Sequence, residues 1–149
     1  MSKKQLVIAI ALLSELFLTT GCRSGKIQIE YIFPDGFRGA AVIRENQAAG
    51  VPSCETPWLP RTQICILKFP ATGILDVQGD SPGKLWHWAS ARYVNGTAIP
   101  VPYTNPGVGV SKGTVALWTF GSVQNGEDWL FVGTDDEFTK FRDEKFRTR

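Results

Sequence analysis

The stretch IQIEYIF, residues 27–33, indicates the fold class most clearly. Its odd-numbered positions are apolar and two of its even-numbered positions are polar, and this period of two predicts a half-buried β-strand. Residues 34–36, PDG, then supply a turn, because proline fixes φ and glycine accepts a positive φ. The alternation returns in QICILKF, residues 63–69. Both stretches predict short strands with one buried face.

Further strand candidates and turn signals follow along the chain. Asn95-Gly96 predicts a hairpin, because a type I′ turn needs a positive φ at both central residues. Glycine (15) and proline (9) are frequent among the 149 residues, which favours many turns over long helices. The expected strands, besides those already quoted, are residues 40–44, 73–77, 84–94, 97–101, 114–120 and 128–132.

Helical character is expected only at the C-terminus. Thr134 and Glu137 form a T-x-x-E capping box, in which each side chain satisfies the other residue's backbone amide. Phe138 and Phe141 would pack one face of this helix onto a sheet. We therefore predict an all-β fold, a small antiparallel β-sandwich with a short C-terminal helix, as a single domain over residues 27–149.

The N-terminus has the layout of an export signal. Lys3 and Lys4 precede an apolar run over residues 6–18, and small residues follow at 19–21. The run is shorter than the ~20 residues of a membrane-spanning helix. Removal of residues 1–21 would leave 128 residues, enough for one domain, with a formal charge of +1. A chain so close to neutral argues against a nucleic-acid partner.

Residues 19–22, TTGC, resemble the lipobox of bacterial lipoproteins, in which a peptidase cuts before the cysteine and the thiol is acylated. The resemblance implies a lipid such as palmitate on Cys22, a tether over residues 22–26 and attachment to a membrane. Arg23, rather than aspartate, follows the cysteine, and that family's sorting rule then implies the outer membrane of a double-membraned bacterium, facing the periplasm. The alternatives are an ordinary signal peptide cut nearby and a signal anchor that is never cut.

Cys54 and Cys65 are the other two cysteines. Paired cysteines in exported proteins are usually oxidised, so we predict a structural disulfide with Cα atoms about 4.4–6.8 Å apart. Their spacing does not fit a C-x-x-C redox motif, and no accompanying ligand set suggests zinc.

No set of residues predicts catalysis. His87, the single histidine, has no nucleophile or orienting carboxylate that the sequence can assign to it, so a hydrolase acting through His87 is the less favoured hypothesis. Three carboxylates at residues 135–137 invite a metal, but helix capping explains them and the calcium-loop spacing is missing. We predict no catalytic residue, no metal and no cofactor.

Five tryptophans are many for this length. Trp86 and Trp88 lie two residues apart and would project from one face of their strand. They could form a stacking platform for sugar rings or a hot spot for a protein partner. The alternative is that they fill the core of the sandwich.

Three stretches resemble an uncharacterised family of small bacterial lipoproteins that carry a domain of unknown function. They are FPDGFRGAAVIR (33–44), ARYVNG (91–96) and FVGTDDEF (131–138), the last matching a C-terminal F-V-G-T-x-x-E-F signature. The resemblance implies the same architecture and an exported location, and it implies no activity. Residues 39–52 also resemble the first hairpin of transthyretin-like sandwiches, at the level of fold alone.

A second resemblance is to the membrane-bound lysozyme inhibitors, through ASARYVNG (89–96) and SKGTVALW (111–118).

The export signal, the all-β pattern and the lack of a catalytic set of residues together predict a lipid-anchored, non-enzymatic envelope protein. This protein would have a structural role or bind an envelope protein or glycan. The alternative is an inhibitor of a wall-degrading hydrolase, with the loop of residues 104–113 plugging the enzyme's active site.

Overall fold

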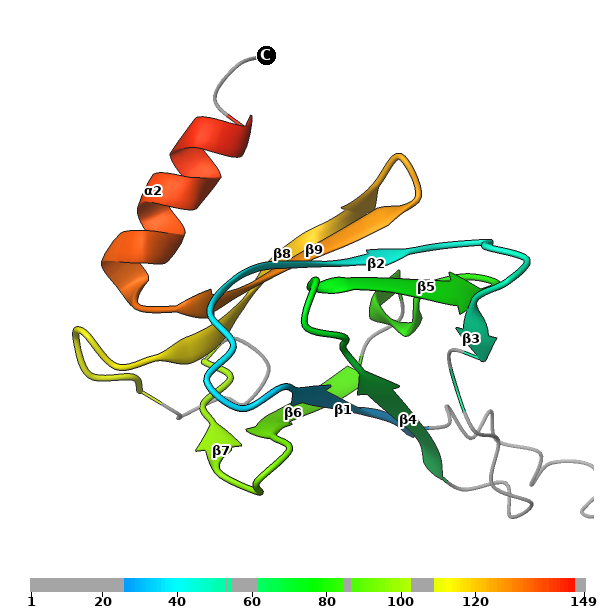
Figure 1. Cartoon of the computed structure of the whole chain (residues 1–149), viewed down its shortest axis with the longest axis horizontal. Coiled ribbons are helices and arrows are strands. Elements are labelled where there is room, and N and C mark those ends of the chain that lie inside the picture. The colour runs from blue at the N-terminus through cyan, green and yellow to red at the C-terminus, as the bar shows by residue number, and fades with distance from the viewer. Residues whose placement is uncertain (1–25, 53, 55–61, 85–86, 103–108, 147–149) are drawn as a thin grey trace, which may run out of the picture.

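Two β-sheets pack face to face and a C-terminal helix lies on the far side of one of them (Figure 1). This computed structural model describes residues 26–52, 54, 62–84, 87–102 and 109–146. The prediction of an all-β sandwich with a short C-terminal helix is confirmed.

The four-stranded sheet has the order β4-β1-β6-β7. Its strands are β1 (Lys26–Phe33), β4 (Thr62–Lys68), β6 (His87–Tyr93) and β7 (Ala98–Ile99). Strand β1 runs parallel to both β4 and β6, and β7 returns antiparallel to β6.

The five-stranded sheet has the order β3-β5-β2-β9-β8. Its strands are β2 (Gly39–Arg44), β3 (Val51–Pro52), β5 (Ile74–Gln78), β8 (Ala116–Gln124) and β9 (Glu127–Gly133). Strand β5 is parallel to β3 and β2, whereas β9 is antiparallel to β2 and β8.

The antiparallel part of the sandwich prediction is wrong, because four of the seven strand pairings in the described part of the chain are parallel. The chain repeatedly crosses between the two sheets: β1 belongs to one sheet, β2 and β3 to the other, and β4 to the first again. A strand that is reached by crossing over and back can run in the same direction as its neighbour, which a tight hairpin does not allow.

The core lies between the sheets and follows the alternation in the sequence. The apolar odd-numbered positions of residues 27–33 all point inward and are buried, as predicted. They meet alternate residues of the facing sheet, Ile43 of β2, Leu75 and Val77 of β5, and Leu130 and Val132 of β9. Ile32 is also only 5% exposed, although it points away from this core.

The predicted hairpin at Asn95-Gly96 forms between β6 and β7, but its turn is not type I′. Gly96 has φ 90°, whereas Asn95 does not have a positive φ. The Gly96 N–H donates to the Tyr93 carbonyl at 2.9 Å, and the Asn95 N–H donates to Asp35 Oδ1 at 2.8 Å. Asn95 therefore contributes to a longer loop that is fastened to the neighbouring turn.

A second Asn-Gly pair has the backbone of the type I′ turn. Asn125 and Gly126 have φ 53° and 75°, and they connect β8 and β9 through the pair Gln124 and Glu127. The sequence pattern does not single out this turn, because Gln124 and Glu127 interrupt the apolar pattern on both sides of it.

Helix α2 (Asp135–Phe146) begins with the predicted capping box. The Thr134 N–H donates to Glu137 Oε2 at 2.8 Å, and the Glu137 N–H donates to Thr134 Oγ1 at 3.4 Å. The Phe138 ring stacks on Trp118 with centroids 5.2 Å apart. The helix thus packs on the outer side of β8 and β9 (Figure 1). Among the helices that the structure describes, none has the length and hydropathy to cross a membrane.

Candidate binding surface

Exposed apolar side chains gather on the side of the four-stranded sheet that points away from the core. We call this surface the outer face. It consists of residues 28, 30 and 32 of β1, residues 64, 66 and 68 of β4, residues 88, 90 and 92 of β6, and residue 94 just after β6. The described part of the chain exposes six large hydrophobic side chains. Four of the six belong to the outer face: Ile64, Ile66, Trp88 and Val94.

The strand register arranges the outer face in three rows. Because β1, β4 and β6 run parallel without a shift, each β1 residue from 27 to 32 has a partner on either side. Successive rows lie about 7 Å apart along the strands and each spans about 10 Å across them. The rows are Ile64–Gln28–Trp88, then Ile66–Glu30–Ser90, then Lys68–Ile32–Arg92.

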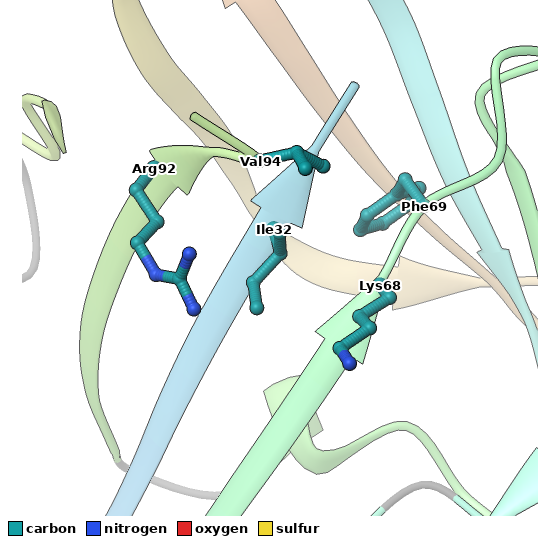
Figure 2. Close-up of a pocket in the computed structure, with 5 residues that line it drawn as sticks. All are labelled: Ile32, Lys68, Phe69, Arg92 and Val94. Atoms are coloured by element: carbon teal, nitrogen blue, oxygen red, sulfur yellow. The ribbon is translucent and has the colours of Figure 1, made fainter. Parts of the chain in front are cut away.

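The last row forms a shallow pocket of about 290 Å³ at the carboxyl ends of the strands (Figure 2). Ile32 forms its floor, with Lys68 and Arg92 on the two flanking strands. Phe69 and Val94 complete the wall. These neighbours explain why Ile32 is buried although it points outward. The pocket combines an apolar floor with two cationic side chains.

The charges of the outer face are only partly compensated. Arg92 Nε lies 2.9 Å from Glu30 Oε1 in a half-exposed ion pair. Within the described residues, no carboxylate lies within ion-pair distance of Lys68. With one carboxylate and two cations, the face carries a formal charge of +1. Its chemistry favours a partner that is apolar in part and anionic in part.

The tryptophans divide between the core and the surface. Trp88 is 37% exposed and lies in the first row of the outer face. Trp118 is buried and its Nε1–H donates to the Gly133 carbonyl at 2.8 Å. Trp129 is half-buried, and Lys145 Nζ lies 4.4 Å from its ring centroid. Trp86 lies outside the described residues, so the predicted role of Trp86 and Trp88 in partner binding stays a prediction.

The disulfide between Cys54 and Cys65 is present. Its Cα atoms are 4.2 Å apart, slightly closer than the lower limit we expected. Cys65 lies on the inner side of β4 and is fully buried, whereas Cys54 follows β3 of the other sheet. The bridge therefore links the two sheets beneath the outer face. The predicted lipidation site, Cys22, lies outside the described residues.

His87 belongs to a polar cluster at one end of the sandwich. Asp128 of β9 is buried and lies near enough to His87 for their charges to interact. Burial raises the pKa of Asp128 above its usual value, more than the Ser81 hydrogen bond and the His87 charge lower it. Ser81 Oγ donates to Asp128 Oδ2 at 2.9 Å. The sequence did not show this carboxylate beside His87, because the two residues lie on different sheets.

The same cluster holds the 3-10 turn η1 (Pro82–Lys84) against the sandwich. The Ser81 N–H donates to Glu45 Oε1 at 2.6 Å, and Lys84 Nζ lies 2.8 Å from Glu45 Oε2. Ser81 is 2% exposed and its hydroxyl proton is directed to Asp128. A serine nucleophile needs an oxygen that a substrate can reach, and Ser81 is buried. The observed contacts therefore describe a structural role for Ser81.

The carboxylates at the start of α2 take part in helix capping and loop contacts. Glu137 completes the capping box and forms an ion pair with Arg38, and these contacts lower the pKa of its carboxyl. Asp135 Oδ1 accepts a hydrogen bond from the Gly113 N–H at 3.2 Å. Across the described residues, no group of three or more His, Cys, Asp or Glu side chains is placed to hold a metal ion. Much of the loop proposed to plug a hydrolase, residues 104–108, lies outside the described residues.

Comparison with known proteins finds little similarity. No protein-family profile matches the chain. None of the curated proteins matches it either. Among solved structures, the chain is similar to a protein described as "Putative Lipoprotein from Bacillus anthracis", with a TM-score of 0.37 and 9% sequence identity over 81% of this chain and 97% of that one. A similarity this low carries no inference about this chain.

Proposed function

We propose that this chain is a lipid-anchored, non-enzymatic protein of the cell envelope that contacts its partner through the outer face of the four-stranded sheet. The observation that carries the proposal is the clustering of exposed Ile64, Ile66, Trp88 and Val94 on one sheet. Exposed apolar side chains that gather on one surface of a small domain often mark an interaction site.

The contrast between the two sheets supports this choice of surface. On the outer side of the five-stranded sheet, Trp118 and Phe131 are buried beneath the aromatic side chains of α2. The four-stranded sheet instead leaves apolar side chains at 37–64% exposure. Helix α2 thus covers the aromatic side chains of β8 and β9, whereas four of the six exposed large hydrophobic side chains of the described residues lie on the outer face of the other sheet.

The anchor follows from the resemblance of residues 19–22 to a lipobox, and the fold is compatible with it. Strand β1 begins at Lys26, four residues after Cys22. Four residues span at most about 14 Å when fully extended. A lipid on Cys22 would therefore hold the sandwich close to the membrane, and Arg23 after the cysteine favours the outer membrane, facing the periplasm, in a double-membraned bacterium.

Fractionation of cells that express the wild type and Cys22→Ser tests the anchor. We expect the wild type in the membrane fraction and the variant in the soluble envelope fraction. Retention of Cys22→Ser in the membrane fraction would show that something other than a lipid on this cysteine holds the protein.

Photo-crosslinking in intact cells tests the contact surface. A photoreactive amino acid replaces Ile66 on the outer face or, as a matched control, Ile74 of β5 in the other sheet; the two side chains are 39% and 43% exposed. We expect adducts from position 66 and few from position 74. Equal adduct yields from the two positions would argue against the outer face as the binding surface.

A further inference from the structure

We infer that the outer face rests on the membrane surface to which the lipid attaches the chain, so that its partner is an anionic phospholipid bilayer. The inference rests on the proposed anchor at Cys22, and it names the partner of the surface described above. Three observations carry it: the chemistry of the outer face, its distance from the anchor, and the charge on the opposite side of the molecule.

The outer face has the mixture of side chains that suits a membrane–water boundary. Trp88 offers an amphipathic ring of the kind enriched at that boundary. Ile64 and Ile66 are exposed on β4, on the other side of β1 from Trp88, and can enter the apolar edge of the bilayer. Lys68, in the last row, is placed to meet lipid phosphates, and Arg92 lies in the same row with its Nε paired to Glu30. All of these side chains lie on the same side of one sheet.

The position of the anchor brings the outer face to the bilayer. The row of Gln28, which holds Ile64 and Trp88, lies two residues after the start of β1. It is therefore the row closest to Cys22 along the chain, and the tether of at most about 14 Å keeps it near the lipid headgroups. The cationic row lies about 13 Å further along the strands.

The charge of helix α2 favours the same orientation. The helix carries five acidic and three basic side chains, a formal charge of −2, and it lies on the far side of the five-stranded sheet. An anionic bilayer would repel this side of the molecule and attract the outer face, whose formal charge is +1. Attraction of the outer face and repulsion of helix α2 therefore both favour the orientation in which the four-stranded sheet faces the membrane.

The anchor also removes the need for strong affinity. Once the lipid is inserted, contact between the outer face and the bilayer is an intramolecular event with a high effective concentration. The domain without its lipid is expected to bind vesicles weakly, whereas the lipidated protein holds the contact continuously.

Depth-dependent fluorescence quenching tests the inference on the lipidated protein. The chain has three cysteines, of which Cys22 is acylated and the other two are paired, so an introduced cysteine is the single free thiol. Ile64→Cys and Ile74→Cys are matched, because both isoleucines are 43% exposed but lie on different sheets. Each variant carries an environment-sensitive fluorophore and is reconstituted into vesicles of phosphatidylethanolamine and phosphatidylglycerol with brominated acyl chains.

We expect several-fold stronger quenching from position 64 than from position 74. Flotation of the vesicles reports on the anchor separately. If the protein floats and both positions are quenched equally, the outer face does not lie on the bilayer and the inference is overturned, while the anchor stands. If the protein does not float, the anchor fails and the inference falls with it.

A charge variant tests the cationic row without disturbing the fold. Lys68→Glu changes an exposed side chain that has no ion-pair partner among the described residues, and Lys112→Glu makes the same change of charge at an exposed position in the loop before β8. Quenching at position 64 should fall in Lys68→Glu and stay unchanged in Lys112→Glu. Equal quenching in the two variants would overturn the role assigned to Lys68.

Discussion

Reduction of the Cys54–Cys65 disulfide should remove a large fraction of the stability of the sandwich. The bridge closes a loop of 12 residues, counting both cysteines, since their sequence separation is 11. The chain-entropy relation gives roughly 3 kcal/mol for a loop of this length. A domain of this size has a free energy of unfolding of about 5–15 kcal/mol, so the reduced protein should be markedly less stable.

Urea unfolding of the soluble Cys22→Ser form, with and without reductant, measures this loss. With a slope of about 1–3 kcal/mol per molar urea, the expected loss lowers the midpoint by about 1–3 M. Thiol titration in denaturant confirms that the bridge is open in the reduced sample. Cys65 is fully buried in β4, so replacing it would also disturb the packing of the core. Cys54→Ser removes the crosslink and leaves the Cys65 side chain in place, so its free energy of unfolding is compared with that of the reduced wild type.

A loss below about 1 kcal/mol in fully reduced protein would refute this reasoning, because it falls well short of the chain-entropy value. It would mean that the segment between the two cysteines stays closed in the unfolded chain, or that the bridge strains the native state by as much as it constrains the unfolded one.

Three further changes test the packing and the buried charge. Burial raises the pKa of Asp128, so the free energy of unfolding of the wild type should fall as pH rises from about 4 toward that raised pKa. Urea titrations at several pH values measure this dependence, and Asp128→Asn should lack it. Phe138→Ala should lower the free energy of unfolding by about 3 kcal/mol in the same assay, since Phe138 of α2 is only 7% exposed and packs on the sheet. An unchanged midpoint would show that α2 does not stabilise the sandwich. Gly73→Ala should lower the melting temperature more than Gly36→Ala. Both glycines have φ near 70°, but a Cβ at Gly73 would lie 2.8 Å from the Ala40 carbonyl oxygen, whereas a Cβ at Gly36 would meet nothing within 4 Å. Equal losses in the two variants would contradict the close contact at Gly73.

Local sequence patterns predicted the features that depend on neighbours in the chain. The alternation over residues 27–33 identified the buried side of β1, because successive side chains of a strand point to opposite faces. The capping box at Thr134 and Glu137 identified the start of α2, because its hydrogen bonds join residues three positions apart. The cysteine pair was found from the count and the export signal together.

Features that depend on tertiary arrangement could not be predicted in this way. Parallel pairing of β1 with β4 and β6 follows from crossings between the sheets, which no local pattern encodes. The outer face joins Ile32, Lys68 and Arg92, which are far apart in the chain and adjacent in the strand register. Asp128 and His87 approach each other across the two sheets. In each case the residues are recognisable only after the strands are ordered.

The mass of the mature protein tests the central claim most directly. Protein purified from the envelope with mild detergent is digested, and its N-terminal peptide is analysed by mass spectrometry. The account predicts a peptide that begins at Cys22 and carries acyl chains on that residue. A peptide that retains residues 1–21, or one that contains an unmodified Cys22, would contradict it.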